Sequence, residues 1–288
     1  MIAVALAILL ASAPEAAEPR AVVPGNGEES AWSPKGERLA FDSNRDGKYF
    51  NVYVVELATG RVTRVTNTKA NDVTPAWSPD GRLLAFTSDR TGHNEIYVVS
   101  ADGSGLHQVT RDGTDSFHPF WSPDGQRLIY CSADPLRAGA TEVDEIYTIR
   151  PDGSDRASVA RLGGINTYAS FSPDGKQILF RKLLSDGNSE IWVMEHNGHN
   201  PKNLTNDPAF DGWPGWSPDG RRIVFASNRK TKGKDYDISV MSSDGSGVRR
   251  LTNVPGRNTS PKWSPEGSRI SFDNSANGQV RILSIPFH

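Results

Sequence analysis

Side chains able to bind a ligand recur at a fixed place before a repeated five-residue motif. About three residues before the aromatic residue of each copy stand Ser30, Thr74, His118, Tyr168, Trp213 and Ser260. Aromatic rings give contact area at a low cost in entropy, and nearby carboxylates can hold basic or hydroxyl groups. The pattern predicts a site for the end of a peptide or a carbohydrate. The predicted binding residues are Asp72, Thr74, Asp115, His118, Tyr168, Asp211 and Trp213.

A structural role for the same residues is the alternative interpretation. Aspartates in such loops often accept hydrogen bonds from neighbouring backbone amides. Trp213 lies in "DGWPGW" and could pack on the proline that follows it. Arg45, Arg90 and Arg229 recur at one place in the repeat, in "SNRDG", "SDRTG" and "SNRKT". This regularity favours structural pairs between loops, which orient the chain more than they stabilise it.

The sequence predicts no catalytic residue, no metal site and no cofactor. His93 and His118 could reach one face and bind a divalent ion with nearby carboxylates. The chain has 6 histidines, and no third one converges with these two. The "GSG" strings lack the strand-to-helix setting of a nucleophile elbow. Cys131 replaces a small strand residue of the other copies and is expected to be a buried structural thiol. We therefore expect a binding protein rather than an enzyme.

The charge balance excludes some partners. The chain has 32 basic and 34 acidic residues and an isoelectric point near 6.3. A nucleic-acid binder normally carries a basic stripe, so no nucleic-acid partner is expected. No polybasic patch for anionic lipid is present either. The single cysteine excludes an intramolecular disulfide and a CxxC metal site.

The N-terminal residues 1–13, "MIAVALAILLASA", are almost wholly apolar. This run is too short to span a bilayer and has the length of the apolar part of a secretory signal. A misplaced start or a frayed tail is the alternative. We expect residues 1–19 to be an export segment, and the mature protein to be periplasmic or secreted, without a stable membrane span.

The motif "WSPDG" and its near copies organise the rest of the chain. Their first residues are Trp32, Trp77, Trp121, Phe171, Trp216 and Trp263. A spacing of about 44–50 residues is close to that of four-stranded propeller blades. In each repeat "SPDG" predicts a tight turn, because proline presets φ and glycine tolerates the last position. The aromatic residue is expected on the innermost strand, packed between neighbouring blades.

The repeats predict an all-β fold, a six-bladed β-propeller of four-stranded antiparallel blades over residues 20–288. The last repeat has three strands, and residues 20–24 are expected to supply its fourth and to close the ring. Closure removes free strand edges. The turns should lie on one face. The candidate binding residues and two long loops, residues 132–145 and 227–237, should lie on the opposite, variable face. The second loop carries Lys230, Lys232 and Lys234.

The repeat "P-x-WSPDG…F-x-S-x-R-x-G…IY-V…DGS…LT" resembles the TolB-type, WD40-like propeller of bacterial envelope proteins. The resemblance covers roughly residues 20–288. It implies six blades, an envelope location and partner binding at the mouth of the ring. The α/β domain that precedes the propeller in TolB has no counterpart among these residues. Related propellers of oligogalacturonate lyases use a histidine-rich metal site.

Together these observations predict a monomeric, non-catalytic module of the cell envelope. Its expected partner is an envelope protein or peptide, bound in a loop-lined funnel. The alternative is a carbohydrate-binding or carbohydrate-processing propeller, with a glycan partner and a metal-dependent lyase or hydrolase activity.

Overall fold

The computed structural model describes residues 18–111, 113–133, 144–231 and 235–288. The apolar N-terminal run, most of the loop at 132–145, and Lys232 and Lys234 lie outside these ranges. Strands and turns make up the described parts of the chain, which contain no helix. The expectation of an all-β fold is therefore confirmed.

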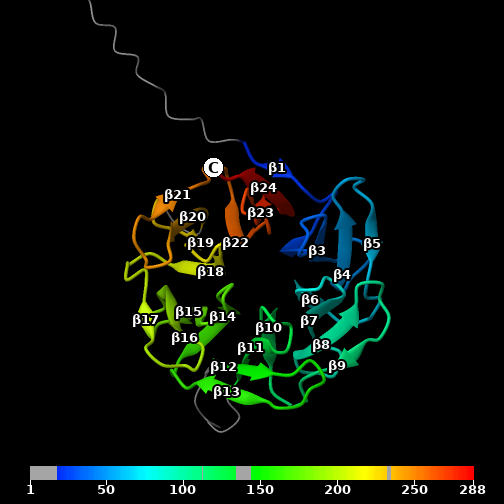
Figure 1. The fold of residues 1–288 in the computed structure, drawn as a ribbon. Coiled ribbons are helices and arrows are strands. Elements are labelled where there is room, and N and C mark those ends of the chain that lie inside the picture. The colour runs from blue at the N-terminus through cyan, green and yellow to red at the C-terminus, as the bar shows by residue number, and fades with distance from the viewer. Residues whose placement is uncertain (1–17, 112, 134–143, 232–234) are drawn as a thin grey trace, which may run out of the picture.

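Figure 1 shows the strands arranged in sheets around a common centre, with β6, β10, β14, β18 and β22 nearest to it. One four-stranded sheet is β2 (Glu28–Trp32), β3 (Arg38–Ser43), β4 (Asn51–Glu56) and β5 (Val62–Arg64). The next is β6 (Asp72–Trp77), β7 (Leu83–Ser88), β8 (Glu95–Ser100) and β9 (His107–Gln108). A third is β18 (Asp211–Trp216), β19 (Arg222–Ser227), β20 (Asp237–Ser242) and β21 (Arg249–Arg250).

The fourth four-stranded sheet joins the two ends of the described chain. It contains β22 (Arg257–Trp263), β23 (Arg269–Ala276), β24 (Gln279–Pro286) and β1 (Arg20–Ala21). β1 pairs antiparallel with β24, with Arg20 opposite Ser284. The first and last strands thus lie side by side, as Figure 1 shows in blue and red.

The remaining strands form one eight-stranded sheet. Its first group is β10 (Ser116–Trp121), β11 (Leu128–Ala133), β12 (Asp144–Ile149) and β13 (Ala157–Ala160). Its second group is β14 (Ile165–Phe171), β15 (Gln177–Leu183), β16 (Ser189–Glu195) and β17 (Lys202–Asn203). One parallel pair, Asp144 with Ile165, joins the groups. The described chain thus shows four separate four-stranded sheets, not the six predicted blades, because this bridge merges the other strands into one sheet.

The turn prediction for "SPDG" is confirmed. In the copy after β6, the Ser78 hydroxyl donates to the Asp80 carboxylate at 2.6 Å, and the Leu83 amide donates back to the Ser78 hydroxyl. Gly81 closes the turn with φ of +71°, a conformation that glycine adopts without steric cost. These hydrogen bonds stabilise the turn, which reverses the chain direction between β6 and β7.

The repeated tryptophans pack between sheets, as predicted. The Trp121 indole donates to the Ala76 carbonyl at 3.1 Å, and that of Trp77 donates to the Ala31 carbonyl at 3.2 Å. Each acceptor lies on the inner strand of the preceding sheet. Trp77 also shares a buried cluster with Val52 of that sheet. The motif therefore forms the turn, and its tryptophan packs against the preceding sheet.

Candidate binding site at the inner strands

Each inner strand carries a bulge at the same place, and the residue there has a left-handed backbone. The six residues, which we call the bulge ring, are Glu29 (φ 49°), Thr74 (53°), His118 (53°), Tyr168 (55°), Trp213 (52°) and Ser260 (52°). Such a backbone costs non-glycine residues about 1–3 kcal/mol each and is often found at functional sites. The sequence reading placed Ser30 in this set. The structure puts Glu29 there, while Ser30 is fully buried against Ser271.

The bulge ring brings three of the predicted binding residues together. The rings of His118 and Tyr168 lie 3.9 Å apart between centroids, and those of Tyr168 and Trp213 lie 6.0 Å apart. The Trp213 indole donates a hydrogen bond of 2.9 Å to the Tyr168 hydroxyl. These residues belong to β10, β14 and β18. They form a continuous aromatic arc from one inner strand to the next.

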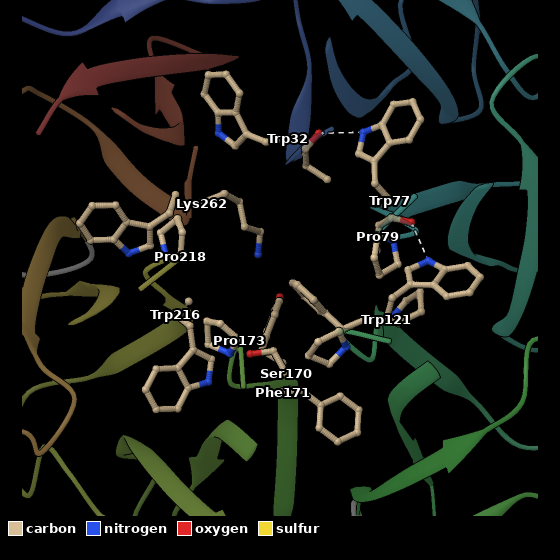
Figure 2. Close-up of a pocket in the computed structure, with 18 of the residues that line it drawn as sticks. Trp32, Trp77, Pro79, Trp121, Ser170, Phe171, Pro173, Trp216, Pro218 and Lys262 are labelled. Atoms are coloured by element: carbon tan, nitrogen blue, oxygen red, sulfur yellow. Dashed lines mark hydrogen bonds between the residues drawn. The ribbon is translucent and has the colours of Figure 1, made fainter. Parts of the chain in front are cut away.

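A cavity of about 460 Å³ lies at the centre of the fold (Figure 2). At its inner end it is lined by four bulge-ring residues, Glu29, Thr74, His118 and Tyr168. Farther along it is lined by the residue before each repeated aromatic: Ala31, Ala76, Phe120, Ser170, Gly215 and Lys262. We call this second set the upper ring. The repeated aromatic residues and the turn prolines Pro79, Pro123, Pro173, Pro218 and Pro265 also line it.

The position of the cavity corrects one expectation. The binding residues were expected to face away from the "SPDG" turns. Pro79, Pro123, Pro173 and Pro218 of these turns are exposed and line the cavity. The cavity therefore reaches from the bulge ring to the turn face. Thr74, His118 and Tyr168 line it at the level of the bulges.

Two of the predicted aspartates have partners inside the fold. The Asp72 carboxylate accepts from Ser88 at 2.6 Å and pairs with Arg90 at 2.8 Å. Asp211 pairs with Arg229 at 2.6 Å. Both aspartate side chains are fully buried. The predicted structural role of Arg90 and Arg229 is thus confirmed, and neither carboxylate lines the cavity.

Arg45 makes a different contact at the equivalent place. Its guanidinium donates to the Asn26 carbonyl, because Gly27 occupies the position that Asp72 and Asp211 hold in other sheets. Asp115 also serves a loop, since its carboxylate accepts from the backbone and side-chain amides of Asn94 at 2.8 and 3.1 Å. The suggested capping role of the aspartates is therefore confirmed for Asp115.

Trp213 lies outside the cavity lining. It packs against Tyr168, Phe210 and Tyr236, and the Arg181 guanidinium lies 5.9 Å from its ring centroid. These contacts support the aromatic arc on the side away from the cavity. Trp213 therefore supports Tyr168, whereas Tyr168 itself reaches the cavity.

Burial sets the protonation state of the bulge ring. Burial lowers the pKa of His118 to about 3, and the nearby charges of Arg181 and Lys262 act in the same direction. The imidazole is therefore neutral at pH 7. Burial also raises the pKa of Tyr168, with Glu29 acting in the same direction. Asp42 and Asp273 have pKa values well above the usual range because they are buried, and neighbouring carboxylates add to the effect.

The upper ring was missed by the sequence reading, although a signal for it exists. The residue before each repeated aromatic lies on the innermost strand of its sheet. These strands are the ones nearest to the centre of the fold, so their last residues can line a central cavity. This rule would have identified Lys262, Phe120 and Ser170 as cavity residues.

The structure also places the residues considered for catalysis and metal binding. His93 is exposed, while His118 is half-buried and lines the cavity. No group of three His, Cys, Asp or Glu side chains in the described ranges is placed to hold a metal ion. Cys131 is a free, buried thiol, and burial raises its pKa to about 12, which confirms the structural role expected of it.

In the described ranges, no helix has the length and apolarity to cross a bilayer.

Comparisons with known proteins identify the family. The sequence matches the family described as TolB beta propeller domain over residues 9–144 and 140–287. TolB from Acinetobacter baumannii is 27% identical, with a TM-score of 0.70 over 83% of this chain. The chain spans 57% of the length of that protein. A protein assigned as TolB from Agrobacterium tumefaciens is 25% identical, with a TM-score of 0.72 and 92% of each chain covered.

An oligogalacturonate lyase in complex with manganese shares the fold alone, at 15% identity and a TM-score of 0.63, with 92% of this chain and 90% of that chain covered. The family match covers nearly the whole sequence, and the TolB structures share the arrangement of sheets. This chain therefore belongs to the TolB beta propeller domain family.

Proposed function

We propose that this chain is a non-catalytic module of the bacterial cell envelope that binds a protein or peptide in its central cavity. The cavity of about 460 Å³ carries the proposal, because it lies where six inner strands meet and has mostly apolar walls with few polar groups. Ligand sites commonly combine these features. Membership of the TolB propeller family supports an envelope location, in the periplasm or outside the cell.

The proposal includes the architecture. The two groups of the eight-stranded sheet each repeat the strand order of the other sheets, and one parallel pair joins them. We count them as two blades, which gives a six-bladed ring closed by the pairing of β1 with β24. The ring would comprise residues 20–288, residues 1–19 would direct export, and the protein would act as a monomer.

The predicted site residues receive different roles in this proposal. Thr74, His118 and Tyr168 line the cavity and would contact the ligand. Trp213 would hold Tyr168 in place through its 2.9 Å hydrogen bond. Asp72, Asp115 and Asp211 would fix the loops around the inner strands through the hydrogen bonds and ion pairs described above. No residue is assigned a catalytic role.

A variant that fills the cavity tests the proposal. Gly215 lies in the upper ring and has room for a side chain, since an added Cβ would meet only ordinary contacts at 3.4 and 3.5 Å. Phenylalanine already occupies the equivalent position as Phe120. Gly215→Phe should therefore fold and block the cavity. Gly47→Phe is the matched control, because Gly47 lies in an exposed loop with open space around it.

The three proteins would be used in cross-linking pull-downs from an envelope extract. The proposal expects wild type and Gly47→Phe to capture the same protein or peptide, and Gly215→Phe to lose it. Equal capture by all three would place the interface elsewhere. Capture of no protein, together with binding of defined oligosaccharides to wild type but not to Gly215→Phe, would support the carbohydrate alternative.

A further inference from the structure

The upper ring contains one charged residue. Five of its members are alanine, alanine, phenylalanine, serine and glycine, and the sixth is Lys262. The other repeats thus show what the fold needs at this position, which is a small or apolar side chain. A lysine there puts one ammonium group into an otherwise uncharged part of the cavity wall.

The Lys262 side chain extends across the cavity. Lys262 lies on β22, and its Nζ lies 5.3 Å from the ring centroid of Phe120 on β10. These strands face each other across the centre of the fold in Figure 1, and Figure 2 shows the ammonium pointing into the middle. Among the described residues, no carboxylate lies within ion-pair distance of this ammonium. The charge is therefore directed at the cavity space.

A second polar group in the same wall also lacks a partner. The Ser170 side chain is buried, with 6% of its surface exposed, and its hydroxyl forms no hydrogen bond. It lines the cavity as a member of the upper ring. Leaving a buried hydroxyl unpaired costs about 1–3 kcal/mol, so a ligand that bonds to it would gain that free energy. The Nδ1 atom of His118, deeper in the cavity, is unpaired as well.

We infer that the upper ring is a carboxylate site, in which Lys262 and Ser170 bind a carboxylate carried by a peptide. This inference rests on the proposed function and specifies its ligand. Lys262 would supply the opposite charge, and the Ser170 hydroxyl would donate a hydrogen bond to a carboxylate oxygen. Charge-assisted hydrogen bonds of this kind are about twice as strong as neutral ones.

The cavity favours a single negative charge. Its lining contains one lysine and no arginine, and Glu29 lies at its inner end. A phosphate dianion or a polyanion would be repelled by Glu29 and would lack the arginine fork that usually holds it. Most of the remaining lining is proline, alanine and aromatic side chains, which suits the apolar residues of a peptide. The carboxylate could be an acidic side chain or a free C-terminus.

Fluorescent hexapeptide libraries test the inference by polarisation. Four libraries share random apolar positions. Two have an amidated C-terminus and differ at the central residue, which is Glu in one and Gln in the other. The third has a free C-terminal carboxylate, and the fourth has a central Lys. The inference expects one of the two carboxylate libraries to bind wild type at least about tenfold more tightly than the Gln library. Which of them does so identifies the source of the carboxylate.

Lys262→Met removes the charge and keeps the length of the side chain. It should erase the preference for carboxylate while the Gln library still binds. Lys176→Met is the control, because Lys176 lies on an exposed turn with 80% of its side chain accessible. Ser170→Ala should weaken the carboxylate library alone.

Three results would overturn the inference. One is peptide binding without a carboxylate preference, which leaves the proposed function standing. Another is a preference that persists in Lys262→Met. The third is binding of a tetragalacturonate but of no peptide library, which would also end the proposed peptide function.

Discussion

Trp213 donates its indole N–H to the hydroxyl of Tyr168 at 2.9 Å, and this bond links two neighbouring inner strands at their bulges. Both residues keep a left-handed backbone of 52–55°. The Tyr168 ring in turn lies on His118. A chain of contacts thus connects a residue outside the cavity with two residues that line it.

Removing this hydrogen bond should cost stability. Tyr168→Phe leaves the Trp213 N–H without its acceptor, at an expected cost of about 1–3 kcal/mol in the free energy of unfolding. Trp213→Phe removes the donor. In a double-mutant cycle measured by urea unfolding, the two changes should couple by about 0.5–1.5 kcal/mol. Additive effects would show that the two rings are placed independently.

The buried ion pair of Asp211 and Arg229 should matter far more than an exposed pair. Arg229→Ala leaves a fully buried carboxylate without its partner, and we expect a loss of about 3–5 kcal/mol in unfolding free energy. Arg61→Ala breaks the exposed pair with Glu56 and should cost less than about 1 kcal/mol. Similar losses for the two variants, measured by denaturant unfolding, would contradict the structural role of Asp211.

Stability should depend on pH through His118. Its pKa is about 3 in the fold, against 6.5 for an unperturbed histidine. Between these values the unfolded chain binds a proton that the folded chain does not, so stability falls as pH drops from 6.5 toward 3. The slope from this group is at most about 1.4 kcal/mol per pH unit.

His118→Asn should remove this part of the slope, and asparagine tolerates a left-handed backbone. Urea unfolding of both proteins at pH 7, 6 and 5 measures the difference, while the other titrating groups cancel. Parallel stability curves would mean that His118 takes up its proton as easily in the fold as outside it.

The repeated tryptophans offer a matched pair. The Trp121 indole donates to the Ala76 carbonyl, whereas the buried Trp216 indole N–H has no partner. Trp121→Phe should therefore destabilise the protein by about 0.5–1.5 kcal/mol more than Trp216→Phe, since only the first change breaks a hydrogen bond between sheets. The comparison uses thermal or denaturant unfolding. A larger loss for Trp216→Phe would count against this bond.

Repetition in the sequence made the fold predictable. Six copies of one motif, each with its own turn residues, indicate repeated antiparallel units and place the tryptophans between sheets. The merging of two groups of strands was not predictable, because it depends on a single contact between Asp144 and Ile165. Local patterns carry no information about such a contact.

The candidate site was predicted only in part. The fixed offset before the motif identified Thr74, His118 and Tyr168, because a repeat places equivalent residues at equivalent points. It also selected Asp72 and Asp211 as ligand-binding residues. The offset does not show that each carboxylate is already paired with an arginine of the same sheet. Lys262 was not predicted, because a single lysine in a variable position resembles a surface residue. Only its place on an inner strand shows that it lines the cavity.

The most direct test of the central cavity is a photo-cross-link from its wall. Phe120 would be replaced by benzoyl-phenylalanine, which preserves an aromatic ring in the upper ring, and Tyr49 in a loop outside the cavity lining would be replaced as a control. After irradiation in an envelope extract, mass spectrometry identifies the adducts. The account predicts a peptide or protein adduct at position 120 that disappears in the Gly215→Phe background and is absent at position 49. An adduct at position 49 alone, or one at position 120 that survives Gly215→Phe, would contradict it.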